Sequence, residues 1–387
     1  MHQRRKLMRT KDENDELLKL PRHVVNLITG KLNVCEFIRF GAVCAPWRSI
    51  AEAIIPYQES QIPWLILGHT NQAHRLFNLL DRRVYEIQTP YGNLGYQIAG
   101  SNYGWFISRH IFNPFTGDEI SLPKYDGWME NAVLSKAPSS SCGKDRACRK
   151  SMDCVVVASD CVYKLAFCRP SDIIWTHVRF QSPSIEDIAV FNGCVYVLSW
   201  GGNLLLYDLD TYRSRYFDMG LDVDHLESHV HCWYLVQSCG ELLMVRRTHT
   251  LYEGSQTSCR PTSFKVFKLD IFGGGPKWVK VESLGEQALF VGRCCSLSLP
   301  AINYLHGIRR NCIYFTNDRL LERILFGGIQ RKVGNSAGIS ALHATGVFSL
   351  EDGSIESYLP DDLQFNAAGR HVLWLSSKFH FGKPAAH

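Results

Sequence analysis

One stretch of the chain, residues 186–218, restricts the possible folds more than any other. It reads EDIAVFNGCVYVLSWGGNLLLYDLDTYRSRYFD, with β-branched and aromatic runs separated by Asn192-Gly193 and by Gly201-Gly202-Asn203. Asn-Gly and Gly-Gly pairs supply the positive φ angles that tight hairpin turns require. The stretch therefore predicts four antiparallel strands that follow one another along the chain.

Two comparable sets of apolar runs follow this unit. The first contains HCWYLVQ, GELLMVRR, FKVFKLD and KWVKVES, and the second contains LFVGRCCSLSL, NCIYFTND, TGVFSL and GSIESYL. Successive four-stranded units are typical of a β-propeller, because each sheet hides its faces only by stacking on its neighbours. Including the less regular runs PWLILG, RLFNLL and RVYEIQT, we expect a propeller of about six blades over residues 60–380, with five or seven as alternatives. The polar stretch 135–150 is interpreted as a long loop.

A short helical block, residues 15–55, precedes the β-structure. Leu20, Val24, Ile28 and Leu32 recur every four residues and predict one apolar stripe, with Val25 beside it. EFIRFGAVC and WRSIAEAI predict two further short helices, so the fold class is mainly β with an N-terminal three-helix module. Three short helices bury little surface by themselves, so their stripe must pack on the rest of the chain or on a second protein.

Composition excludes several classes of function. The formal charge of +5 over 387 residues is small and scattered, which argues against nucleic acid as a partner. The charged N-terminus lacks the apolar core of a signal peptide, and no apolar run is long enough to span a bilayer, so we expect no membrane partner. Fourteen cysteines occur without a CxxC pair, which favours reduced thiols in the cytoplasm, the nucleus or both.

No motif indicates catalysis, a cofactor or a metal. HExxH, GxSxG and the P-loop are missing, and the glycines at 273–275 have no Lys-Ser/Thr after them. His225, His229 and His231 lie close together but have no thiol or acidic partner at a diagnostic spacing. The carboxylates in the regular unit are interpreted as structural groups that accept hydrogen bonds from backbone N–H groups at strand ends and turns; they are Glu186, Asp187, Asp208 and Asp210.

The succession LPRHVVNLITGKL and FIRFGAVCAPWRS, residues 20–32 and 37–49, resembles an F-box. The rest of the chain resembles the C-terminal half of plant F-box proteins catalogued as domain of unknown function 295, a kelch-like or propeller-like region. The stretches that carry this second resemblance include FNPFTGDEISLP, YLVQSCGELLMVRR and GVFSLEDGSIE.

The resemblance implies a non-catalytic substrate receptor of an SCF-type cullin–RING ubiquitin ligase. Residues 15–55 would dock a Skp-type adaptor, and residues 60–380 would hold an unknown target protein. The residues implied in adaptor binding are Leu20, Pro21, Val24, Val25, Ile28, Leu32, Phe40, Val43, Cys44, Trp47 and Arg48. Two alternatives are a propeller scaffold whose divergent F-box does not engage a ligase, and a propeller enzyme.

The target site is expected on the loops at one end of the propeller, since blade-to-blade packing occupies the strand faces. The turn Trp200-Gly201-Gly202-Asn203 offers an aromatic side chain beside flexible backbone. The competing interpretation is an ordinary hairpin with Trp200 packed inward. Trp233, Trp278 and Trp374 are expected mainly in the core.

Overall fold

The fold is seen in a computed structural model of the chain. The structure describes residues 20–29, 31–32, 34–43, 47, 49–51, 62–69, 73–79, 81–88, 98–115, 117–138, 154–160, 164–178, 184–221, 229–252, 258–271, 275–301, 307–316, 345–360, 363 and 373–376. Two α-helices, one short 3-10 helix (Trp200–Gly202) and twenty-five strands are assigned within these ranges. The strands form six sheets.

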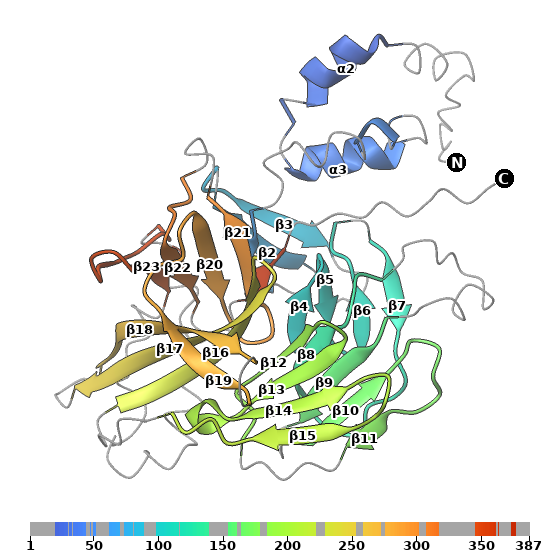
Figure 1. The fold of residues 1–387 in the computed structure, drawn as a ribbon. Coiled ribbons are helices and arrows are strands. Elements are labelled where there is room, and N and C mark those ends of the chain that lie inside the picture. The colour runs from blue at the N-terminus through green and yellow to red at the C-terminus, as the bar shows by residue number, and fades with distance from the viewer. Residues whose placement is uncertain are drawn as a thin grey trace.

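The six sheets are arranged as the blades of a β-propeller, so the expected architecture and blade number are confirmed (Figure 1). Neighbouring blades meet through their inner strands, with β12 (Asp187–Phe191) in contact with both β8 (Met129–Leu134) and β16 (His229–Ser238). In order from the inner strand, blade two contains β4 (Gly100–Asn102), β5 (Trp105–Ile107), β6 (His110–Phe112) and β7 (Glu119–Ser121). Blade three contains β8 (Met129–Leu134), β9 (Val156–Asp160), β10 (Leu165–Cys168) and β11 (Thr176–Val178).

Blade four is the unit that the sequence predicted most clearly. It contains β12 (Asp187–Phe191), β13 (Cys194–Leu198), β14 (Leu204–Asp208) and β15 (Ser214–Phe217). Asn192 and Gly193 have φ angles of 48° and 77°, as the two-residue turn between Phe191 and Cys194 requires. Blade five also has the predicted four strands, β16 (His229–Ser238), β17 (Glu241–Tyr252), β18 (Ser258–Asp270) and β19 (Lys277–Val281).

Blade six corrects the prediction for LFVGRCCSLSL, which is two strands and not one. These are β20 (Gln287–Val291) and β21 (Leu297–Pro300), and they pair antiparallel. The blade continues with β22 (Cys312–Phe315), β23 (Gly346–Ser349) and β24 (Ile355–Glu356), and its order is β21-β20-β22-β23-β24. Because β20 lies parallel to β22, it is an additional strand placed between the inner strand and the rest of the blade.

Blade one closes the ring with strands from both parts of the chain. Its inner strand is β25 (Leu373–Leu375), followed by β1 (Trp64–His69), β2 (Ala73–Asn78) and β3 (Val84–Gln88). β25 pairs antiparallel with β1 through Trp64 and Leu375. The C-terminal strand thus joins the last part of the propeller to the first.

The N-terminal helices have a small core of their own and lie outside the propeller (Figure 1). They are α2 (Arg22–Thr29) and α3 (Val34–Val43), and residues 47 and 49–51 are also helical. Val25, Phe37, Phe40 and Ala51 are buried together, and the rings of Phe40 and Trp47 stack 4.4 Å apart. No helix in the described ranges is long and apolar enough to cross a membrane. Most of the predicted 135–150 loop, residues 139–150, lies outside the described residues.

Candidate functional site

The two N-terminal helices expose an apolar surface on the side away from their own core. Leu27 is 65% exposed, Ile28 is 38% exposed and Val43 is 64% exposed. Pro21, directly before α2, is exposed as well. Much of the apolar area of these side chains stays accessible to solvent, so this surface is suited to contact another protein.

The eleven residues implied in adaptor binding separate into two groups. Pro21, Ile28 and Val43 are exposed and Val24 is half-buried. The others that the structure describes contribute to the core of the helices: Val25 and Phe40 are buried, and Leu20, Leu32 and Trp47 pack against them. Cys44 and the side chain of Arg48 lie outside the described residues. The four-residue spacing in the sequence did not indicate Leu27, because this residue lies off the apolar stripe.

The propeller axis is crossed by the loop that joins β20 to β21, residues 292–296. Arg293 donates from Nη1 to Glu130 Oε1 of blade three at 2.9 Å and from Nη2 to the Ile185 carbonyl at 2.8 Å. The Cys294 carbonyl accepts from the N–H of Ser101 in blade two at 3.1 Å. The loop therefore ties blade six to blades on the other side of the axis.

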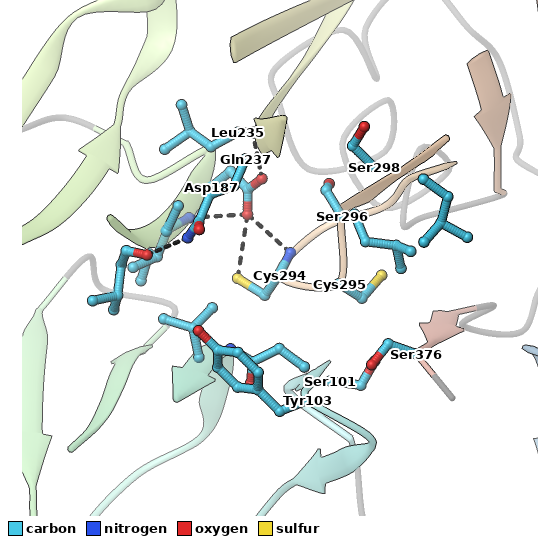
Figure 2. A pocket seen from close by; sticks show the side chains of 17 residues that line it. Ser101, Tyr103, Asp187, Leu235, Gln237, Cys294, Cys295, Ser296, Ser298 and Ser376 are labelled. Carbon is cyan, nitrogen blue, oxygen red and sulfur yellow. Dashed lines mark hydrogen bonds between the residues drawn. The ribbon is translucent and has the colours of Figure 1, made fainter. Parts of the chain in front are cut away.

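Asp187 is the central acceptor of this arrangement (Figure 2). Its Oδ1 accepts from the N–H of Cys294 at 2.9 Å, and its Oδ2 accepts from the N–H of Leu235 in blade five at 2.8 Å. Oδ1 also accepts from the N–H of Ile188 and from the Cys294 thiol. Burial raises the pKa of Asp187 to about 6, against the lowering effect of these hydrogen bonds. One carboxylate thus joins blades four, five and six, and it confirms the structural interpretation of this residue.

Asp208 confirms the same interpretation at a surface turn. Its Oδ1 accepts from the N–H groups of Asp210 and Thr211 at 2.9 and 2.8 Å. These hydrogen bonds lower the pKa of Asp208. The residue closes the turn between β14 and β15.

A cavity of about 160 Å³ lies at the axis, beside the crossing loop (Figure 2). Residues from all six blades line it, including Ser376, Asn102, Val133, Asp187, Gln237 and Ser298. Sequence analysis did not predict it, because the lining residues are spread from position 101 to position 376 and only ring closure brings them together.

The histidine cluster does not form a metal site in the described part of the chain. His231 is buried, and its Nδ1 lies 3.2 Å from Thr248 Oγ1. His225 and the side chain of His229 lie outside the described residues. Among the side chains that the structure describes, no three His, Cys, Asp or Glu residues are placed to hold a metal ion.

The tryptophans fall into the two predicted classes, with one correction. Trp233, Trp278 and Trp374 are buried in the core. Trp200 is 47% exposed, so the interpretation in which it packs inward is wrong. The reason is local: Gly202 approaches Leu221 closely, and its carbonyl accepts from the indole N–H of Trp278, so the space beneath the turn is already filled.

Residues 76–349 match the family described as the KIB1-4 beta-propeller. The chain belongs to this family. Its relatives include F-box protein At2g26160 of Arabidopsis thaliana, 24% identical over 339 residues that cover 79% of this chain and 97% of that protein. F-box protein KIB2 of Arabidopsis thaliana is 24% identical over 332 residues, which cover 76% of this chain and 70% of that protein.

The KIB1-4 assignment supports the resemblance to plant F-box proteins that carry a propeller. The description of the matched family names neither a kelch-like region nor domain of unknown function 295, so both stay predictions. Among solved structures, the N-terminal domain of Nup159 is similar at 8% identity and a TM-score of 0.33, covering 57% of this chain and 63% of that chain. A similarity this weak adds nothing to the assignment.

Proposed function

We propose that this protein is the substrate-receptor subunit of an SCF-type cullin–RING ubiquitin ligase. Residues 15–55 form the F-box domain and dock a Skp-type adaptor, and the propeller domain, residues 60–380, holds the target. The protein works in the cytoplasm, the nucleus or both. The observation that carries the proposal is the exposed apolar surface of α2 and α3, in a chain whose propeller belongs to the KIB1-4 family and whose relatives are named F-box proteins.

The proposed contribution to ubiquitin transfer is proximity. A receptor that holds a target near the charged ubiquitin carrier raises the effective concentration of the target's lysines. No bond is made or broken on this chain, and the propeller needs neither cofactor nor metal for this role.

The exposed and the buried helical residues have different proposed roles at the adaptor interface. Ile28 and Val43, with Leu27 beside them, are accessible to the adaptor, whereas Val25 and Phe40 support the helices from inside. The direct contacts are therefore assigned to the exposed group, and the buried group holds that group in place. Trp47 belongs to the group that supports the helices, because its ring stacks on the ring of Phe40.

The target surface is placed at the end of the propeller that carries Trp128 and Trp200. These tryptophans are 57% and 47% exposed. Hydrogen bonds connect their surroundings: Trp200 N–H donates to Ser184 Oγ, and Arg293 joins the Ile185 carbonyl to Glu130. Large aromatic side chains held on a rigid base are common anchors of protein interfaces.

Capture of a purified Skp-type adaptor by the full chain tests the docking assignment. Ile28→Asp together with Val43→Asp places two charges on the exposed surface and should reduce capture at least tenfold, since a buried unpaired charge is costly. The matched control is Ile173→Asp with Ile174→Asp, which places the same two charges at propeller residues that are 91% and 73% exposed. Undiminished capture by the folded double variant contradicts the docking assignment, and no capture by the natural chain favours the scaffold alternative.

Target capture from proteasome-inhibited cells tests the second surface. Trp128→Ala with Trp200→Ala should lose the target and keep the adaptor, whereas Ile173→Ala with Ile174→Ala should keep both. Ile173 and Ile174 lie in the β10–β11 connection and Trp200 in the β13–β14 connection, and successive hairpins of a blade point to opposite ends. Loss of the target from the isoleucine variant alone would move the site to the other end.

A further inference from the structure

The proposed receptor function does not account for the size and chemistry of the axial cavity. Its volume of about 160 Å³ is close to that of a cavity of about 150 Å³ in another protein that holds one benzene molecule. A ring-sized molecule can therefore occupy it. The walls are mixed, with aliphatic groups such as Val133 and Ile188 beside serine and amide side chains.

The described residues of the lining offer no cationic side chain to a ligand. None of the residues that line the cavity is Lys, Arg or His, so an anion has no counter-charge there. The single carboxylate, Asp187, already accepts four hydrogen bonds from three backbone N–H groups and a thiol. A cation would have to compete with these donors. The cavity is therefore suited to an uncharged molecule.

One lining group is available for recognition. The side chain of Gln237 donates from Nε2 to the Val190 carbonyl, which fixes the orientation of the amide. Within the described part of the chain, its Oε1 accepts no hydrogen bond, and Gln237 is exposed. By contrast, both polar atoms of the Asn102 side-chain amide are hydrogen-bonded: Nδ2 donates to the Leu134 carbonyl and Oδ1 accepts from the Leu134 N–H. Gln237 thus presents a positioned acceptor to a ligand hydroxyl.

We propose that the axial cavity binds a small, uncharged, ring-sized molecule that donates a hydroxyl hydrogen bond to Gln237 Oε1. The ring lies against the aliphatic part of the wall, and the loop 292–296 forms one side of the site through Cys294, Cys295 and Ser296. This site is separate from the adaptor and target surfaces. A ligand in it contacts the inner strands of several blades at once and stabilises the ring.

Four probes of similar size separate the chemical alternatives: benzyl alcohol, toluene, benzoate and benzylamine. Their binding to the full chain is measured by saturation-transfer NMR with competition, and stabilisation by thermal unfolding at increasing probe concentration. We expect benzyl alcohol to bind about five- to tenfold more tightly than toluene, the effect of one hydrogen bond, and the two charged probes to bind most weakly. Equal binding of benzoate and benzyl alcohol, or no saturation transfer to any probe, overturns the proposal.

Two variants locate the site. Gln237→Met keeps the length of the side chain and removes the acceptor, so benzyl alcohol should bind no better than toluene. Ser298→Leu narrows the cavity and should weaken both probes at least fivefold. Ser214→Leu, an exposed position on β15, is the matched control and should change neither. If Ser298→Leu does not fold, Gln237→Met still decides, because an unchanged preference for the alcohol in that variant contradicts the assignment.

Discussion

Asp187 shows how a single buried side chain organises the centre of the ring. It is 1% exposed, and its hydrogen bonds reach β12, β16 and the loop between β20 and β21. A strand-end carboxylate normally satisfies local backbone groups only. Here two of its partners are 48 and 107 residues away in sequence, so it fixes blade positions in addition to a local turn.

The raised pKa of Asp187 predicts a specific dependence of stability on pH. The folded pKa of about 6 exceeds the ordinary aspartate pKa of 3.8, so the native state binds more protons than the unfolded state between these values. The contribution of this group to the free energy of unfolding is therefore largest below the unfolded pKa and is lost as pH rises towards 7, by roughly 3 kcal/mol. Urea unfolding between pH 4 and 7 measures it.

Comparison with Asp187→Asn isolates this contribution, because the amide does not ionise. The natural protein should lose stability relative to the variant as pH rises through this window. Asp208→Asn is the control at a carboxylate whose pKa is lowered, and the natural protein should not lose stability relative to this variant over the same pH range. Parallel pH profiles for the natural protein and Asp187→Asn would contradict the prediction.

At the scale of elements, β25 and β20 are the two strands that depart from a simple series of four-stranded units. β25 fills the inner position of blade one, and β20 is inserted into blade six. They meet through Trp374, which is 0% exposed, donates from Nε1 to the Val291 carbonyl at 3.1 Å and packs edge-on against Phe290 at 5.1 Å. Trp374 therefore holds the closing strand against the inserted one.

Trp374→Ala should destabilise the protein by about 3–5 kcal/mol, since it leaves a cavity at the ring closure and an unpaired Val291 carbonyl. The measurement is denaturant unfolding of the full chain. Trp128→Ala is the matched control, because Trp128 is 57% exposed, and it should change stability by less than about 0.5 kcal/mol. Equal effects of the two substitutions would show that β25 does not close the ring.

At the scale of the whole molecule, the described cysteines are free thiols and most of them are buried, which indicates a tightly packed propeller. Eight cysteines whose side chains the structure describes are free, and among these eight only Cys239 is exposed. Burial raises the pKa of Cys154 to about 12 and raises the pKa of Cys168 and Cys294 as well. Thiols of this kind are poor nucleophiles because the thiolate is scarce.

Native alkylation tests this packing. Iodoacetamide at pH 8 should modify Cys239 within minutes and leave Cys154, Cys168 and Cys294 unmodified over the same time, as measured by peptide mass spectrometry. Denaturation in guanidinium should make all of them reactive, which serves as the control for detection. Rapid native modification of Cys294 would mean that the axial loop opens readily, against the hydrogen bonds seen here.

Local signals were sufficient to predict the propeller and the helical module. Turn residues such as Asn192 and Gly193 act within a few positions, and the alternation of apolar residues shows which segments are strands. The same reasoning failed for LFVGRCCSLSL, because its apolar residues continue through the turn that separates β20 from β21. It also assigned no strand at Leu373–Leu375, where three residues have no pattern of their own.

The sequence by itself determined that the chain is a mainly β propeller preceded by short amphipathic helices, since these are consequences of short-range periodicity and turn chemistry. Only the tertiary structure decided which helical residues face outward, because Leu27 and Val25 are both aliphatic and differ only in the direction of their side chains. It also decided the axial site. Asp187, Gln237, Cys294 and Ser376 are far apart in the chain, and the closure of six blades around one axis is the physical reason that they meet.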